Sequence, residues 1–290
     1  MPKHYLALFG LALTWGTSYI LIKWGLEVYT PVQLASLRLG ISTVAFLPWF
    51  VSRVKSVPRR QLGLLFVIGL TGTAVPAFLY AIAQTRVSSS ITGALSSLTP
   101  LFTLLVGVVF FGLLPGRRRT LGVFVGLSGA LLLAFLGQSA SSGGGSFGYA
   151  FFIFGATLCY AISSNLVGRH LQTMKPLTIS AVSFFMVGLP ALVWLFAGSG
   201  FVTVLLTHPD GWPAFGYITF LSLFSTVLAS IVFFRLVQWT SPLFASTVSY
   251  LIPVIALGWG FLDGEQLAWY HLLSMGLILF GVYLSRKSKF

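Results

Sequence analysis

Charged residues are scarce in this 290-residue chain. Only 7% of its residues are Asp, Glu, Lys or Arg, whereas a soluble domain carries about 25%. Hydrophobic residues make up 57%. A bilayer core requires about 20 mainly apolar residues per helix, and Pro/Gly or charge-rich breaks divide the chain into segments of that length. The composition therefore excludes an ordinary soluble domain and predicts a protein that crosses a membrane several times.

Acidic residues and cysteine are rarer still. The chain has 4 Asp and Glu against 17 Lys and Arg, which gives a formal net charge of +13. The cations form short clusters between apolar segments, so anionic membrane lipids are the expected partner and nucleic acid is not. The single Cys159 can form no internal disulfide. HExxH, Walker and Cys/His metal motifs are absent from the sequence, so we expect no metal, no cofactor and no enzymatic activity.

Ten apolar segments account for almost the whole chain. They cover about residues 4–25, 31–50, 61–84, 88–113, 119–137, 147–168, 176–198, 212–236, 241–262 and 267–285. The longest polar connection, residues 138–146, has the Ser/Gly composition of a flexible linker. It separates a first five-helix domain, 1–137, from a second, 147–290. The predicted fold class is an all-α polytopic membrane protein with ten transmembrane helices.

The two halves share residues that recur at constant offsets. One offset relates the first two helices to the sixth and seventh: Trp15 with Tyr160, Ser18 with Ser163, Leu21 with Leu166, and Pro31 with Pro176. A second relates the third and fourth helices to the eighth and ninth: Tyr80 with Phe233, Ser88 with Ser241, Ser96 with Ser249, Leu98 with Leu251, Pro100 with Pro253, and Gly107 with Gly260. Each half has five predicted helices, and after an odd number of crossings the chain is on the opposite side of the membrane. The second half must therefore be inverted relative to the first. Inverted-repeat transporters hold their substrate near the midplane, between the halves.

Most Lys and Arg residues fall in alternate loops of this arrangement. These loops lie on the same side as the N-terminus, whereas the four acids fall in or beside the loops of the other side. Cytoplasmic loops carry the excess of Lys and Arg in membrane proteins. We therefore expect a multi-pass protein of the bacterial inner membrane with both termini in the cytoplasm.

Short motifs in both halves carry a family resemblance. They are Trp15-Gly16-Thr17-Ser18-Tyr19 followed by Lys23, Pro31 followed by Arg38-Leu39, Leu98-Thr99-Pro100-Leu101, and Leu251-Ile252-Pro253 followed by Gly264-Glu265. In these motifs the chain resembles the drug/metabolite transporter superfamily, specifically its ten-helix EamA-type exporters. One departure is Pro115-Gly116-Arg117, where the family usually has a Gly-Glu pair. The resemblance implies export of small metabolites by alternating access, most like the bacterial exporters of amino acids, including aromatic ones.

Polar and aromatic side chains gather on the first, third, fourth, sixth and ninth predicted helices. The predicted substrate-binding residues there are Trp15, Ser18, Tyr19, Tyr80, Ser96, Ser97, Tyr160, Ser163, Asn165, Ser246, Ser249 and Tyr250, with helix kinks at Pro100 and Pro253. Carbonyls freed at kinked helices tend to line cavities, and aromatic faces beside hydroxyls suit an apolar solute with polar ends. The alternative is packing, because small hydroxyl residues let helices approach closely and Tyr or Trp anchors a helix at the interface.

Arg38 is the remaining predicted substrate-binding residue. It lies about seven residues, or ~10 Å, into the second helix. A permanent cation at that depth is costly and needs a partner. Two interpretations stay open: the side chain reaches the outer interface or caps a helix C-terminus, or it attracts a carboxylate of the substrate.

Solute export is the favoured function, with a membrane-embedded enzyme and a channel as alternatives. An enzyme would need a base beside a nucleophile, and a channel would not need the alternation that inverted repeats permit. Amino acids are the expected solutes, with drugs, nucleosides and sugars as alternatives. Because no acid falls in the middle of a helix, we expect facilitated transport without ion coupling. Both halves are present in one chain, so we expect a functional monomer, although Gly122 and Gly126 form a motif that serves either internal packing or dimerisation.

Overall fold

The computed structural model describes residues 3–114, 116–137, 146–262 and 269–285, and these ranges are helical with short connections and no strand. The elements of the first half are α1 (Lys3–Leu26), α2 (Pro31–Arg53), α3 (Arg59–Gly69), η2 (Leu70–Ala74), α4 (Val75–Ala83), α5 (Ser89–Ser96), α6 (Thr99–Phe111) and α7 (Arg117–Gly137). Those of the second half are α8 (Ser146–His170), α9 (Pro176–Gly198), α10 (Phe201–Thr207), α11 (Gly211–Phe220), η4 (Leu221–Leu228), α12 (Ala229–Trp239), α13 (Pro242–Ser246), α14 (Val248–Leu262) and α15 (Trp269–Ser285).

Seven helices within the described ranges are long and apolar enough to cross a membrane. Two further apolar helices in these ranges are shorter, at Thr120–Gly129 and Pro242–Ala256. The expectation of an all-helical protein with several membrane spans is thus confirmed, while the count of ten stays a prediction. Residues 138–145 of the predicted linker and the Gly264-Glu265 pair lie outside the described residues.

Four of the predicted segments are interrupted in the structure. The segment predicted over 88–113 is divided between α5 and α6 at Ser97 and Leu98, and the one over 241–262 is divided between α13 and α14 at Thr247. The segments over 61–84 and 212–236 contain a π-helical stretch instead, η2 and η4. The connection before α11 holds a short helix, α10, which none of the predicted segments covers. Hydropathy detects a whole span and not the hydrogen-bond pattern inside it.

The starts of several helices follow directly from local side chains. At the start of α2, the Thr30 hydroxyl accepts from the amide of Gln33 (3.3 Å) and the Gln33 side chain accepts from the amide of Thr30 (3.0 Å), which is a capping box. The hydroxyls of Ser88 and Ser241 cap α5 and α13 by accepting from the amides of Ile91 and Phe244. Ser88 and Ser241 are related by the second sequence offset, so the two halves begin these helices alike.

The π-helical stretches recur at matching places in the two halves. The offset that pairs Tyr80 with Phe233 also pairs Thr73 of η2 with Thr226 of η4. π-helical turns are rare, occur mostly as interruptions inside α-helices, and are frequent at functional sites. In both halves the third helix therefore changes its winding in the interior of the bundle.

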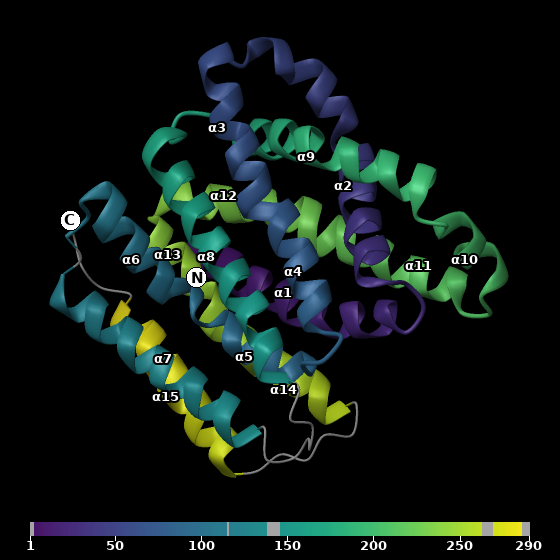
Figure 1. Ribbon diagram of the computed structural model, residues 1–290. Helices are drawn as coiled ribbons and strands as arrows, with labels where there is room; N and C mark the ends of the chain where they lie inside the picture. Colours follow the sequence, from purple (N-terminus) through teal and green to yellow (C-terminus); the bar gives the residue numbers. More distant parts are fainter. Residues whose placement is uncertain (1–2, 115, 138–145, 263–268, 286–290) are drawn as a thin grey trace.

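Two long helix pairs join the halves, α2 with α9 and α7 with α15. Figure 1 shows α7 and α15 side by side at the edge of the bundle. Glycines permit both approaches: a Cβ atom on Gly188 would overlap the Thr43 hydroxyl, and one on Gly281 would lie 2.5 Å from the Cα of Gly126. The glycine motif that contains Gly126 therefore serves packing within the chain.

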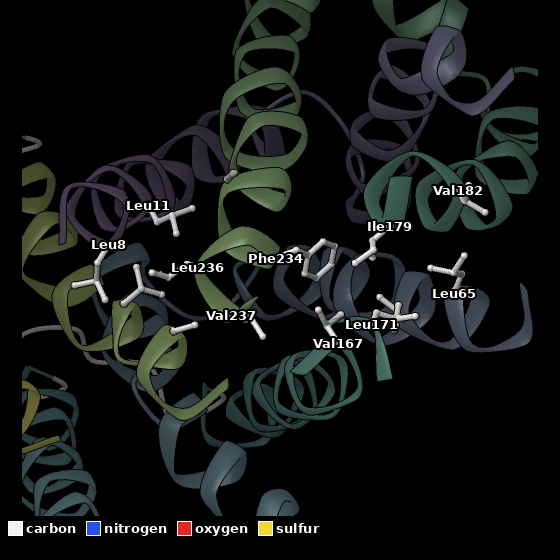
Figure 2. Close-up of a cluster of buried hydrophobic side chains, with 14 of the residues drawn as sticks. Leu8, Leu11, Leu65, Val167, Leu171, Ile179, Val182, Phe234, Leu236 and Val237 are labelled. Atoms are coloured by element: carbon white, nitrogen blue, oxygen red, sulfur yellow. The ribbon is translucent and has the colours of Figure 1, made fainter. Parts of the chain in front are cut away.

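Apolar clusters pack at both ends of the bundle. Figure 2 shows one of them, which joins Leu8 and Leu11 of α1 to Leu171 and to residues of α3, α9 and α12. A second cluster contains Ile20 and Ile22, farther along α1. The two clusters lie about 15–20 Å apart along this helix at 1.5 Å per residue. The interior between them is where polar groups are enclosed.

Candidate functional site

A cavity of about 80 Å³ lies between these clusters and is lined by residues of both halves. Its wall includes Phe234 from the cluster of Figure 2 and Ile22 from the second cluster. A volume of roughly 10–15 Å³ by this kind of measure holds one water molecule. The cavity therefore has room for several waters or for part of a small solute.

Most of the predicted substrate-binding residues line this cavity. They are Trp15, Ser18, Tyr19, Arg38, Tyr80, Ser96, Tyr160, Ser163, Ser246 and Ser249. They come from α1, α2, α4, α5, α8, α13 and α14, and thus from both sequence repeats. These residues lie together because the matching helices of the two halves pack around the same interior.

Among the residues that the structure describes, Arg38 is the one charged residue of the cavity wall. It is 8% exposed, so its side chain does not reach the outer interface. Its Nε donates to the hydroxyl of Thr226 in η4 at 2.7 Å. The acids in the described part of the chain, Glu27 and Asp210, are exposed and outside the cavity. A buried cation without a carboxylate beside it is costly in a membrane, and an anionic solute would offset that cost.

Three tyrosine rings form a row on the same wall. The ring centroids of Tyr19 and Tyr80 are 5.6 Å apart, and those of Tyr80 and Tyr160 are 6.1 Å apart. All three residues line the cavity. Tyrosine offers both an apolar face and a hydroxyl, so this wall can contact the polar and the apolar parts of one solute.

Trp15 forms a second aromatic wall together with α12. Its ring centroid is 5.2 Å from that of Phe233, and its indole N–H donates to the carbonyl of Ser225 at 2.9 Å. The Ser225 hydroxyl in turn donates to the carbonyl of Thr14 at 2.8 Å. This reciprocal pair of hydrogen bonds fixes α1 against η4, so Trp15 both lines the cavity and joins the halves.

The structure places Ser97, Asn165 and Tyr250 away from the cavity wall. The Asn165 amide donates to the carbonyls of Thr103 (3.0 Å) and Ala161 (2.9 Å). The Tyr250 hydroxyl donates to the carbonyl of Val123 in α7 at 3.0 Å. These side chains hold neighbouring helices together by satisfying carbonyls that no water reaches.

Ser97 has a role connected with the predicted kink at Pro253. Pro253 lies inside α14, and because proline has no N–H the carbonyl of Ser249 loses its helical donor. The hydroxyl of Ser97 donates to that carbonyl at 2.9 Å. In the first half Pro100 lies in the first turn of α6, and the carbonyl of Ser96, four residues earlier, accepts from Thr99 at 2.7 Å.

The repeat explains why Ser97 must act across the halves. The offset that pairs Pro100 with Pro253 pairs Thr99 with Ile252, which has no hydroxyl. The second half therefore lacks the local donor that the first half has. Ser97 supplies the donor from the other half of the chain.

Sequence reasoning missed the contribution of the eighth predicted helix. Ser225, Thr226, Ser230 and Phe234 of η4 and α12 line the cavity, as do Gly72 and Thr73 of η2. A signal was present, because the offset that pairs Tyr80 with Phe233 also pairs Thr73 with Thr226. Hydroxyl residues at matched positions of two repeats are candidates for one central site.

One hydroxyl of the cavity has no protein partner. Ser163 lines the cavity, and its Oγ is buried and makes no hydrogen bond. Its repeat equivalent, Ser18, donates to the carbonyl of Trp15 at 2.5 Å. An unpaired buried hydroxyl costs free energy, and a solute atom that accepts from Ser163 would recover that cost. The described residues contain no group of His, Cys, Asp and Glu able to hold a metal ion.

A cavity that combines apolar walls with a few hydroxyls and a guanidinium, at the centre of a bundle of membrane-length helices, is typical of a membrane transporter. The sequence model of the EamA-like transporter family matches residues 2–135 and 147–286, which together are most of the chain. The chain therefore belongs to the EamA-like transporter family and is a multi-pass membrane transporter.

Relatives of known sequence agree with this assignment. An uncharacterized inner membrane transporter of Escherichia coli K12, YedA, is 29% identical over 290 residues, which cover 98% of this chain and 90% of YedA. An uncharacterized transporter of Archaeoglobus fulgidus is 24% identical over 278 residues, or 94% of this chain and 96% of that protein. A crystal structure with 15% identity covers 98% of this chain and 96% of its own, with a TM-score of 0.70, and thus shares the fold.

Proposed function

We propose that this transporter exports small metabolites, chiefly amino acids with hydrophobic or aromatic side chains, by alternating access through the central cavity. The observation that carries the proposal is the buried guanidinium of Arg38 in a cavity between the two halves, without a carboxylate partner among the described residues. An α-carboxylate supplies the missing charge and forms charge-assisted hydrogen bonds with arginine.

The rest of the cavity wall suits the rest of an amino acid. Trp15, Phe233 and Phe234 present apolar surface, and the tyrosine row presents faces and hydroxyls. Ligand sites combine such apolar walls with a few placed polar groups. The aromatic wall favours a leucine-like or phenylalanine-like side chain over a charged one, because no group there compensates a second charge.

The architecture that we propose has ten membrane helices in two inverted halves, 1–137 and 147–290, with both termini in the cytoplasm of the bacterial inner membrane. It is supported by the matched caps, the matched π-helical stretches and the two helix pairs between the halves. Reporters fused after Phe290 and within the connection 53–60 should report the cytoplasm, and one at Gly144 the outside. An external signal from the fusion after Phe290 would contradict this topology.

Alternating access requires that the ends of the bundle open in turn. The cluster of Figure 2 closes the end that contains Leu8, and the cluster around Ile20 closes the other. We propose that separation of one cluster at a time exposes Arg38 and the tyrosine row to one side of the membrane. The single chain holds both repeats, so a monomer is sufficient.

The transport that we propose is passive. Coupled carriers commonly place a carboxylate at membrane depth, where it exchanges a proton or binds a cation. The described residues of the cavity wall include no Asp, Glu or His. A neutral amino acid should therefore equilibrate across the membrane, and an imposed proton or sodium gradient should not accumulate it. Accumulation driven by either gradient would refute the passive mechanism.

Counterflow in proteoliposomes tests the function directly. Vesicles loaded with unlabelled L-phenylalanine or L-leucine should take up the same labelled amino acid, whereas vesicles loaded with a sugar or nucleoside should not show exchange of that solute. Arg38→Gln should abolish the exchange. Arg235→Gln removes an equally permanent charge from an exposed position of α12, outside the cavity, and should retain it. Exchange of sugars, nucleosides or cationic drugs in place of amino acids would overturn the proposal.

A membrane-embedded enzyme has little support from the cavity. Hydroxyls act as nucleophiles when a base lies within hydrogen-bond reach. The described cavity wall has several serines but no His, Asp or Glu beside them, and its one cation cannot act as a base. The hydroxyls there are suited to binding and not to catalysis.

A further inference from the structure

We propose that the cavity recognises its solute through a carboxylate alone, so that an apolar monocarboxylate without an amino group binds more tightly than the matching amino acid. This inference rests on the proposed function of the cavity as a solute site and defines its substrate class. Amino acids then belong to a wider class of apolar carboxylic acids.

The distribution of charge around the cavity is one-sided. Among the described residues, the wall carries one positive charge, that of Arg38, and no negative one. The tyrosine, serine and threonine side chains that complete its polar part are neutral. A carboxylate gains from this field, whereas an ammonium group within a few Å of the guanidinium is repelled in a medium that screens poorly.

The guanidinium is oriented to receive a carboxylate. Its Nε is held by the Thr226 hydroxyl at 2.7 Å, which fixes the plane of the group against η4. Arginine has four further N–H donors on its terminal nitrogens, and a carboxylate accepts from such a fork with two parallel hydrogen bonds. Thr226 thus acts as a positioning residue for the anion site.

A second donor faces the same cavity. The Ser163 hydroxyl is buried without a partner, and a Cβ atom on Gly72 of η2 would lie 2.5 Å from its oxygen. Glycine at this position lets η2 pack against the hydroxyl, where a larger side chain would collide with it. A donor that no protein group uses suits an anion or a neutral acceptor of the solute.

The aromatic residues do not replace the missing acid. A cation is attracted to the open face of an aromatic ring. The rings of Tyr19, Tyr80 and Tyr160 instead pack in a row with centroid separations of 5.6 and 6.1 Å, and Trp15 packs against Phe233. Each of these five rings thus has another ring as a neighbour, and the guanidinium of Arg38 in the same wall repels a cation that approaches them.

Binding to the purified protein tests the inference with four ligands of nearly the same shape. The probes are 3-phenylpropionate, L-phenylalanine, 3-phenylpropan-1-ol and phenethylamine, titrated at pH 7 by calorimetry and by intrinsic tryptophan fluorescence. We expect 3-phenylpropionate to bind about 10-fold more tightly than L-phenylalanine, because it lacks the repelled ammonium. The alcohol should bind about 10- to 100-fold more weakly than the carboxylate, and the amine should show no binding.

Variants locate the effect at Arg38. Arg38→Gln should reduce the preference for 3-phenylpropionate over the alcohol to less than about 3-fold, while Arg235→Gln should leave it unchanged. Thr226→Val should weaken 3-phenylpropionate binding, and Thr226→Ser, which keeps the hydroxyl, should restore it. The ligand series on the unaltered protein keeps the test decisive if Arg38→Gln does not fold.

The outcomes separate this inference from the proposed function. If phenethylamine binds as tightly as 3-phenylpropionate, or if L-phenylalanine binds more tightly than 3-phenylpropionate, recognition through the carboxylate alone is overturned. This holds even if counterflow shows that amino acids are carried. The expected order of binding without counterflow of any of these solutes would support the recognition and count against transport of them. Absence of binding by all four probes would overturn the inference.

Discussion

The hydrogen bond from Ser97 to the carbonyl of Ser249 allows a quantitative test of how the halves are joined. The bond is 2.9 Å long, and the two residues are 0% and 5% exposed. Pro253 removes the helical donor for this carbonyl. In Ser97→Ala the carbonyl therefore has no donor in the interior, whereas in Pro253→Ala the amide of residue 253 becomes available to it.

The expected magnitude follows from this difference. A hydrogen bond between membrane helices contributes about 0.6 kcal/mol on average and up to about 1.7 kcal/mol, and an unsatisfied buried acceptor costs about 1–3 kcal/mol. Since the carbonyl has no alternative donor, Ser97→Ala should lower the free energy of unfolding by about 1.5 kcal/mol. In the Pro253→Ala background it should cost less than about 0.5 kcal/mol, which gives a coupling energy of about 1 kcal/mol.

A double-mutant cycle measures this coupling. The four proteins are purified, and their reversible unfolding is followed by circular dichroism in mixed micelles with an increasing fraction of dodecyl sulfate. Ser96→Ala serves as the matched control, because its buried hydroxyl donates to the carbonyl of Gly93 in its own helix. That substitution should cost the same in both backgrounds. Equal costs of Ser97→Ala in both backgrounds, within about 0.3 kcal/mol, would refute the argument.

Two further predictions concern residues that face different surroundings. Tyr250→Phe should lower the free energy of unfolding by about 1 kcal/mol and leave solute affinity unchanged, because its hydroxyl donates to a carbonyl of α7 outside the cavity. Tyr80→Phe should instead lower the affinity for the solute in the counterflow assay, because Tyr80 lines the cavity. Equal losses of affinity in the two variants would contradict this assignment. Gly281→Leu should strongly lower the melting temperature, because its Cβ would lie 2.5 Å from the Cα of Gly126, whereas Gly276→Leu enters open space and should have little effect. Similar melting temperatures for these two variants would show that α7 and α15 are not closely packed.

Local signals in the sequence were sufficient for the general architecture. The scarcity of charge and the length of the apolar segments determine the membrane environment, since a buried charge is costly in lipid. The constant offsets identified matching positions, and Ser88 and Ser241 indeed cap matching helices. These features depend on composition and on neighbours a few residues away, which a sequence displays directly.

The direction of individual side chains could not be read in the same way. Ser96 and Ser97 are adjacent hydroxyl residues at the end of α5, yet Ser96 lines the cavity and Ser97 donates to another helix. Successive residues of a helix point about 100° apart, so Ser96 and Ser97 face different neighbours. Which of them faces the cavity depends on how α5 and α14 pack, and no local pattern contains that information.

The sequence by itself determined that Arg38 lies within a membrane helix, and it left open whether the side chain reaches the interface or a solute. The tertiary structure buries the side chain by packing η4 of the other half against α2, so that Thr226 accepts from its Nε. Contact of Arg38 with a solute stays a prediction. The π-helical turns of η2 and η4 were equally hidden, because they arise from a shift in backbone hydrogen bonding that hydrophobic periodicity does not record. Contacts between residues nearly 200 positions apart form only when the two halves meet.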